Sequence, residues 1–289
     1  MSTVHATKRP NTATPIQTIE IAYTPDSDDA FNFYGWEKGF VSLPGVKAKF
    51  KRGHISELNS AAMNGQYDVV AVSSVFFPYL ADKYWILSVG SSVGRGYGPI
   101  LVAKSPIAIS SLSGKRVAIA GLNTTGGTLA RMYCPAGTTF VQLPYDTIAD
   151  SILRGEVDAG VMIHEELIHY PKLGLHRVED LGAAWTRDTG LPLPVGLNIA
   201  KKSLGRERAG EIARACRKSL QWSMNHAPDA MNYVGSLGRG CADKFVPMFC
   251  NTDTLDLPQD VRRAMRLLFD RLAERGWAPR LENIEVIDA

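Results

Sequence analysis

A histidine stands at the end of an apolar segment near the middle of the chain. Residues 160–163 (GVMI) lead directly to His164, and a short amphipathic segment that ends at Gly155 precedes them. Strand ends are where open α/β sheets place ligand chemistry, and imidazole titrates close enough to neutral pH to act as a general base. A lone histidine in such a place is more often a structural polar residue than a catalyst. The rest of the chain must decide between the two.

Two other segments place polar groups where an expected strand meets an expected helix. Residues 24–29 (TPDSDD) follow a strand, and most of these acidic and hydroxyl side chains should cap the next helix, although one can also face a ligand hydroxyl. Residues 122–128 (LNTTGGT) also lead into a helix. There Thr124 and Thr125 could hold an anion or polar ligand, or could form only an N-cap beside a glycine turn.

Several familiar motifs are excluded by spacing. The glycines of residues 94–98 (GRGYG) do not lie between a strand and a helix, so they indicate a backbone crossing between lobes rather than a dinucleotide fingerprint. No lysine follows residues 126–127 in the spacing of a nucleotide P-loop. His164 and His169 are five residues apart, which would put them on different faces of a helix and excludes a zincin site. We therefore expect no metal.

Hydrophobic periodicity predicts alternating strands and helices. Residues 55–74 and 147–163 share a pattern of helix, Asn-Gly or Arg-Gly, acidic turn and apolar strand, which indicates two related α/β lobes. The chain after residue 205 is expected to be mainly helical. The expected strands include residues 18–23, 46–50, 67–74, 99–103, 139–143, 160–163 and 192–200.

Composition narrows the class of protein. The 289 residues are 45% hydrophobic and 21% charged, which is ordinary for a globular protein, and the formal net charge of +3 does not favour a nucleic-acid partner. No apolar run reaches the length of a membrane span. Residues 1–17 are polar without an apolar signal core, so we expect a disordered tail and a cytoplasmic protein. The four cysteines lie far apart and are expected to be reduced thiols.

The order and spacing of short motifs resemble one enzyme family. Residues 24–31 (TPDSDDAF) look like the N-terminal signature of 1,4-dihydroxy-6-naphthoate synthases, lyases of the futalosine route to menaquinone. Supporting motifs are Val-Ser at 72–73, GRGYGP at 94–99, Thr-Thr at 124–125, GEVDAG at 155–160, IHE at 163–165 and TGLPLP at 189–194. Together they cover about residues 19–204.

The resemblance implies an α/β fold with two lobes like the type II periplasmic binding proteins, with the ligand cleft between them. Lobe 1 would contain residues 18–103 and 198–289, and lobe 2 residues 104–197. The implied substrate is cyclic dehypoxanthinyl futalosine, a small molecule with an aromatic carboxylate and a sugar moiety. The resemblance implies no cofactor, no nucleic acid and no membrane, and a homodimer is left open.

The resemblance also implies roles for individual residues. His164 matches the family's proposed general base, which takes a proton from a sugar hydroxyl to start a retro-aldol-type cleavage. Arg95 is expected to help bind the aromatic carboxylate. The remaining expected substrate-binding residues are Asp29, Ala71, Val72, Ser73, Thr124 and Thr125.

Two other functions stay open at this point. The same fold commonly serves non-enzymatic solute-binding proteins of transporters, which predicts an export signal and gives His164 no special role. A sister enzyme of the chorismate-dehydratase type uses the same kind of fold, and the match at His164 argues against it.

Overall fold

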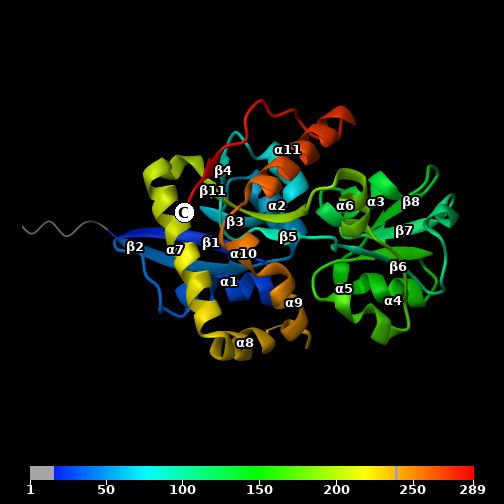
Figure 1. Cartoon of the computed structure of the whole chain (residues 1–289), viewed down its shortest axis with the longest axis horizontal. Helices are drawn as coiled ribbons and strands as arrows, with labels where there is room; N and C mark the ends of the chain where they lie inside the picture. Colours follow the sequence, from blue (N-terminus) through cyan, green and yellow to red (C-terminus); the bar gives the residue numbers. More distant parts are fainter. Residues whose placement is uncertain (1–15, 238–239) are drawn as a thin grey trace, which may run out of the picture.

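A computed structural model describes residues 16–237 and 240–289, and it has two α/β lobes side by side (Figure 1). Each lobe is built on its own mixed sheet. The first sheet has seven strands in the order β12-β4-β11-β3-β1-β2, with β5 paired to β11, and the second has five in the order β10-β6-β9-β7-β8. The two-lobe α/β organisation expected from the sequence is confirmed.

The strands of the first sheet come from both ends of the chain. The strand β11 joins them, because it pairs antiparallel with β3, β4 and β5. The strands are β1 (Gln17–Tyr23), β2 (Val46–Arg52), β3 (Val69–Ser73), β4 (Tyr84–Leu87), β5 (Ser92–Gly94), β11 (Leu193–Lys201) and β12 (Val286–Ile287).

The second sheet is formed by the middle of the chain. Its strands are β6 (Ile100–Ala103), β7 (Arg116–Ile119), β8 (Thr139–Gln142), β9 (Ala159–Met162) and β10 (His176–Asp180). The expected lobe boundaries at 103/104 and 197/198 are therefore wrong. The strand β6 pairs with β9 and β10 in the second sheet, and β11 already pairs with β5 from Leu193 onward in the first.

Helices cover both faces of the first sheet (Figure 1). The helix α1 packs against α7, α8 and α9 on one face, and α2 and α11 lie on the other. Both faces of β3 are therefore buried, as its continuous apolar sequence requires. The helices are α1 (Ser27–Glu37), α2 (Ile55–Met63), α3 (Thr125–Tyr133), α4 (Ile148–Leu153), α5 (Glu166–His169), α6 (Leu181–Thr189), α7 (Arg206–Asn225), α8 (Ala227–Gly235), α9 (Ala242–Phe249), α10 (Thr252–Leu255) and α11 (Gln259–Glu274).

The two lobes repeat one structural unit. The unit is a strand-helix-strand-helix-strand sequence, β1-α1-β2-α2-β3 in the first lobe and β7-α3-β8-α4-β9 in the second. In each unit the first strand pairs parallel with the other two. Asp68 precedes β3 and its Oδ2 accepts from the amide of Glu20 at 2.9 Å, while Asp158 precedes β9 and accepts from Arg116 at 2.8 Å. When Asp68 is aligned with Asp158, Ser74 is aligned with His164, because each lies six residues further along the chain.

The glycines of residues 94–98 lie where the chain crosses from one lobe to the other. A Cβ atom on Gly98 would come within 3.0 Å of the Cα of Gly182, and one on Gly182 would come within 2.1 Å of the Tyr97 carbonyl oxygen. Two backbones therefore touch here, because neither glycine carries a side chain. This agrees with the expected backbone crossing.

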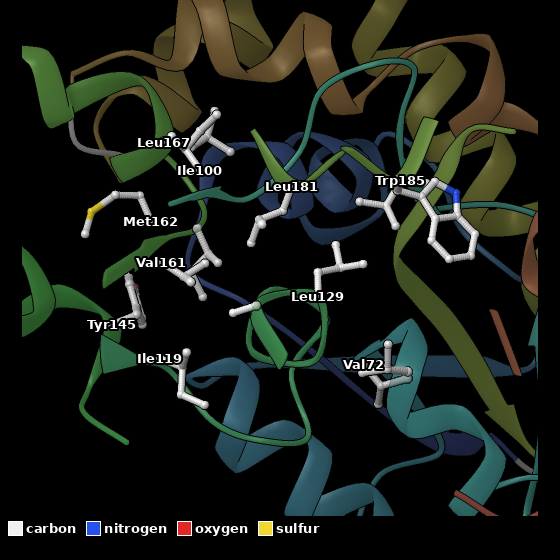
Figure 2. Close-up of a cluster of buried hydrophobic side chains, with 14 of the residues drawn as sticks. Val72, Ile100, Ile119, Leu129, Tyr145, Val161, Met162, Leu167, Leu181 and Trp185 are labelled. Carbon is white, nitrogen blue, oxygen red and sulfur yellow. The ribbon is translucent and has the colours of Figure 1, made fainter. Parts of the chain in front are cut away.

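A buried hydrophobic cluster extends through both lobes. Figure 2 shows part of it, with Val72 from the first lobe and Ile119, Leu129 and Val161 from the second. In the described part of the chain, no helix combines the length and the apolar character needed to cross a membrane. The expected disordered tail, apart from residues 16 and 17, lies outside the described residues, and β1 already begins at Gln17.

Candidate active site

A pocket lies between the two lobes and is lined by residues from both. It contains about 710 Å³ of space, including its opening to solvent. The carboxyl ends of β1, β3 and β9 and the N-terminal ends of α1 and α3 reach it, as expected for the strand ends of α/β sheets. The lining also includes the crossing strand β11 and two phenylalanines of α9.

His164 lies in this pocket in an unusual backbone conformation. Its φ is 55°, and within the described ranges it is the only residue other than glycine with positive φ. This left-handed conformation costs a residue with a Cβ atom about 1 kcal/mol. Such strain persists where surrounding structure enforces it, and it is concentrated at functional sites.

An ion pair across the two lobes fixes the imidazole. The Nδ1 atom of His164 lies 2.8 Å from Oδ2 of Asp26, whose side chain is only 4% exposed. The ring of Tyr145 packs edge-on against the imidazole, with the ring centroids 4.9 Å apart. The Nε2 atom is buried and has no hydrogen-bond partner in the part of the chain that the structure describes. When Nδ1 carries a proton that Asp26 accepts, Nε2 of the neutral ring is a free base.

The carboxylates around His164 change its pKa. Burial lowers the pKa of His164, but Asp26, Asp28 and Asp29 together outweigh burial and raise the pKa above its usual value. Asp26 contributes most among them because it is both a neighbouring charge and a hydrogen-bond partner. The site therefore stabilises the imidazolium that forms when Nε2 accepts a proton.

The acidic residues that begin α1 do not act as ordinary caps. Asp26 occupies the N-cap position but makes no side-chain cap bond, because its carboxylate faces His164. Asp29 lines the pocket, and its Oδ2 accepts from the backbone amide and the hydroxyl of Thr24 at 2.9 and 2.8 Å. Burial is the main cause that raises the pKa of Asp29 to about 6. The sequence-based expectation of simple caps is corrected for both residues.

The other expected binding residues of the first lobe reach the pocket. Ala71, Val72 and Ser73 all line it at the end of β3. The Ser73 amide donates to Oδ1 of Asn59 at 3.0 Å, and the Asn59 side chain donates to the Ser73 hydroxyl at 3.2 Å. Asn59, which lies in the helix α2, therefore fixes the position of Ser73 at the end of β3.

Both threonines at the start of α3 also line the pocket, but their hydroxyl protons are already used. Thr124 is the N-cap: its hydroxyl accepts from Gly127 at 3.1 Å and donates to the Gly121 carbonyl at 2.7 Å. The Thr125 hydroxyl donates to the Val195 carbonyl of β11 at 2.6 Å. These contacts hold the first turn of α3, whose residues Thr125 and Gly126 line the pocket at the positive end of the helix.

Arg95 is not part of the pocket lining. Its guanidinium binds Asp253 at 2.6 Å and Asp260 at 2.7 Å. Both acids raise the pKa of Arg95, so it stays charged. Arg95 therefore does not make the expected contact with a substrate carboxylate. Instead, it connects the loop after β5 to the C-terminal helices α10 and α11.

Some pocket residues carried no clear signal in the sequence. Asn198 lies in β11 with 1% of its surface exposed, and neither its Oδ1 nor its Nδ2 has a hydrogen-bond partner among the described residues. An asparagine within the apolar run of residues 195–200 was the signal that could have identified it. Phe245 and Phe249 of α9 add an apolar wall from the distant C-terminal region. Among residues 16–237 and 240–289, no three His, Cys, Asp or Glu side chains are placed to hold a metal ion.

Comparison with known proteins gives consistent relatives. A family model described as menaquinone biosynthesis matches residues 19–274. A 1,4-dihydroxy-6-naphthoate synthase from Thermus thermophilus is 33% identical over 267 residues, which cover 91% of this chain and 97% of that protein.

Two solved structures show the fold. A protein from Archaeoglobus fulgidus is 38% identical with a TM-score of 0.84, and the match covers 90% of this chain and 98% of that one. The alkanesulfonate-binding protein of Xanthomonas axonopodis is only 12% identical, but superposes with a TM-score of 0.73 over 96% of this chain and 100% of its own. The fold is the two-lobe type of the periplasmic binding proteins.

Proposed function

The chain belongs to the menaquinone biosynthesis family, and from this premise we propose that it is a 1,4-dihydroxy-6-naphthoate synthase. In this proposal it is a carbon-carbon lyase that acts on cyclic dehypoxanthinyl futalosine. The observation that carries the proposal is the pairing of His164 with Asp26 in the pocket, which leaves the buried Nε2 atom without a hydrogen-bond partner among the described residues.

The proposed reaction needs a single base. Nε2 of His164 takes the proton of a sugar hydroxyl, and the electrons of the O–H bond form a carbonyl. The adjacent C–C bond breaks, and its electron pair moves into the conjugated ring system of the substrate. Asp26 stabilises the imidazolium formed in this step, and a well-placed general base contributes about 10²–10⁴-fold to the rate.

The lining of the pocket contains side chains suited to both parts of this substrate. Apolar side chains, among them Ile163, Leu167, Phe245 and Phe249, form a surface suited to a fused aromatic ring. Polar groups, including those of His164 and Asn198, lie on the same pocket and suit sugar hydroxyls. Binding would give hydrogen-bond partners to the side-chain amide of Asn198, which is buried and has none among the described residues.

The substrate carboxylate needs a different partner from Arg95. The described pocket lining contains no lysine or arginine. The amides of Thr125 and Gly126 at the start of α3 are the best candidates, because a helix N-terminus offers N–H donors and a favourable dipole to an anion. We therefore assign the carboxylate to this helix end.

The direct test is to incubate the purified protein with cyclic dehypoxanthinyl futalosine and follow 1,4-dihydroxy-6-naphthoate by chromatography. We expect turnover by the native protein and a loss of about 10²–10⁴-fold in kcat for His164→Asn. Asparagine suits this variant because it tolerates the left-handed backbone. His169→Asn is the matched control, because His169 is five residues further on and outside the pocket lining.

Two results would contradict the proposal. Tight binding without turnover would support a solute-binding protein, the role suggested by the transport proteins that share the fold. Equal turnover by native protein and His164→Asn would remove the base from its assigned role.

A further inference from the structure

Three carboxyl groups are crowded at the start of α1. Asp26, Asp28 and Asp29 are each at most 7% exposed. In the described part of the chain, the pocket lining offers only His164 as a cation to balance them. Burial and neighbouring like charges both disfavour ionised carboxylates, so three negative charges facing at most one positive charge are unfavourable. The cluster should therefore keep a proton on one carboxyl group.

Hydrogen-bond donors show which carboxyl group keeps the proton. Asp26 faces Nδ1 of His164 at 2.8 Å, and Asp29 accepts two short bonds from Thr24. Within residues 16–237 and 240–289, the carboxyl group of Asp28 receives only a long bond of 3.3 Å from the Ser92 hydroxyl and a contribution from the Asp29 amide, and its Oδ1 has no partner. A carboxylate with few donors is the least stable in its ionised form.

The remaining neighbour of Asp28 supplies no positive charge. The thiol of Cys250, at the end of α9, donates to the Asp28 backbone carbonyl at 3.2 Å. Burial, with Asp28 and Asp29, raises the pKa of Cys250 well above its usual value, so it stays a neutral thiol. Burial and the charges of Asp29 and Asp26 also raise the pKa of Asp28 well above the usual range, and the opposing effect of His164 is smaller.

We infer that Asp28 is a neutral carboxylic acid that donates a hydrogen bond from its carboxyl group to a substrate carbonyl oxygen. The inference rests on the proposed cleavage and adds a second catalytic residue to it. As the C–C bond breaks, its electron pair reaches that oxygen, and Asp28 transfers its proton to give an enol. His164 then carries the hydroxyl proton, and solvent returns one proton from His164 to Asp28 after each turnover. Protons and electrons therefore balance.

The protonation state can be tested without substrate. Infrared difference spectra of native protein minus Asp28→Asn at neutral pH should contain the carbonyl band of a protonated carboxylic acid. Asp29→Asn is the matched control, and its difference spectrum should lack that band at pH values above the pKa of Asp29, about 6. Absence of the band from the native protein at neutral pH, or its persistence in Asp28→Asn, would overturn the inference whatever the substrate is.

The catalytic role needs kinetics. Asp28→Ala removes the donor and should lower kcat by about 10²–10³-fold, the usual cost of one donor to a developing oxyanion. Asp28→Asn keeps an N–H donor and should lose less. In native protein, kcat should fall at high pH as Asp28 loses its proton, and this fall should be absent from Asp28→Asn. Asp26, Asp29, His164 and Cys250 all remain in that variant, so a fall that persists belongs to one of them and overturns the assignment. Equal losses of kcat in the two variants would also overturn it.

Discussion

Oδ2 of Asp26 lies 2.8 Å from Nδ1 of His164, although the two residues come from different lobes. Asp26 begins the first helix of one lobe, and His164 follows the strand β9 of the other. The contact exists only while the lobes are together in the arrangement described above. The proposed base is therefore oriented by the association of the two lobes.

Replacing Asp26 should affect both the rate and its pH dependence. Asp26→Asn removes the charge that holds the Nδ1–H tautomer, and we expect kcat to fall by about 10²-fold or more, in the direction of the loss seen when an Asp–His pair is broken. Because Asp26 raises the pKa of His164, the low-pH fall in kcat should move to lower pH in the variant. Rate profiles between pH 5 and 9 would measure both effects.

A matched control for this variant is Asp68→Asn. Asp68 holds a backbone amide at the base of the first sheet and lies outside the pocket lining. We expect a small loss of stability and an unchanged pH profile. A shift of the profile in both variants would argue against a specific effect of Asp26 on His164.

Asn198→Leu should separate stability from activity. Both the Oδ1 and the Nδ2 atom of Asn198 are buried and have no hydrogen-bond partner within the described ranges, so an apolar side chain of similar shape removes an unsatisfied polar group. We expect the melting temperature to stay equal or rise, while KM for the substrate rises about tenfold, the cost of about 1.4 kcal/mol of binding energy. A parallel loss of stability and activity would mean that Asn198 has only a structural role. Thermal unfolding and initial rates give the two values.

Gly90→Ala tests the role of Asn198 without changing Asn198 itself. A Cβ atom on Gly90 would lie 2.0 Å from Nδ2 of Asn198 and would displace the amide. Gly96→Ala is the control, because Gly96 has a similar φ of 81° against 84°, but a Cβ atom on Gly96 would meet no other atom within 4 Å. Both variants carry a backbone cost of about 1 kcal/mol. Only Gly90→Ala should also raise KM for the substrate. Equal KM values for the two variants would show that displacing the Asn198 amide does not affect substrate binding.

The ionisable groups of the pocket should make the folded protein more stable at mildly acidic pH than at alkaline pH. The folded protein raises the pKa of His164, Asp28 and Asp29, so all three bind protons more tightly when folded. The stabilisation from His164 is complete below its unfolded pKa and is lost as pH rises through the folded value. The carboxyl groups act in the same direction: stability falls between their unfolded pKa near 4 and their folded values, about 6 for Asp29.

Urea unfolding at pH 5.5 and 8 would measure this difference. We expect a higher free energy of unfolding at pH 5.5, and a smaller difference for Asp28→Asn, which cannot lose a proton. If the native protein is equally stable at both pH values, the carboxyl groups are ionised at the same pH in both states, and the inference about Asp28 would lose its support.

Local sequence patterns predicted the strands and helices that begin each lobe. The alternation in β1 and the apolar run that ends at Ser73 gave nearly correct bounds. The sequence also predicted that His164 follows a strand, because the end of a strand is determined by the residues of that strand. The sequence did not predict that Asp26 is the partner of His164, because packing between the lobes brings the two residues together.

The role of Arg95 shows the same limit. A positively charged residue in a glycine-rich loop has no local feature that distinguishes a substrate contact from a structural ion pair. Its partners, Asp253 and Asp260, are in the C-terminal helical region, and the sequence gives no measure of that proximity. The lobe boundary was misplaced for a related reason, because the partners of β6 depend on sheet pairing and not on its own residues.

The repeated unit also has a consequence for how the two edges of the pocket differ. Ser74 corresponds to His164, and Thr124 corresponds to Asp26 as the residue that begins a helix. The places that correspond to Asp26 and His164 are therefore occupied by hydroxyl side chains, which do not exchange protons at neutral pH. The repeated unit therefore does not repeat its chemistry, because an imidazole paired with a carboxylate is present in only one of the two equivalent arrangements in the described part of the chain.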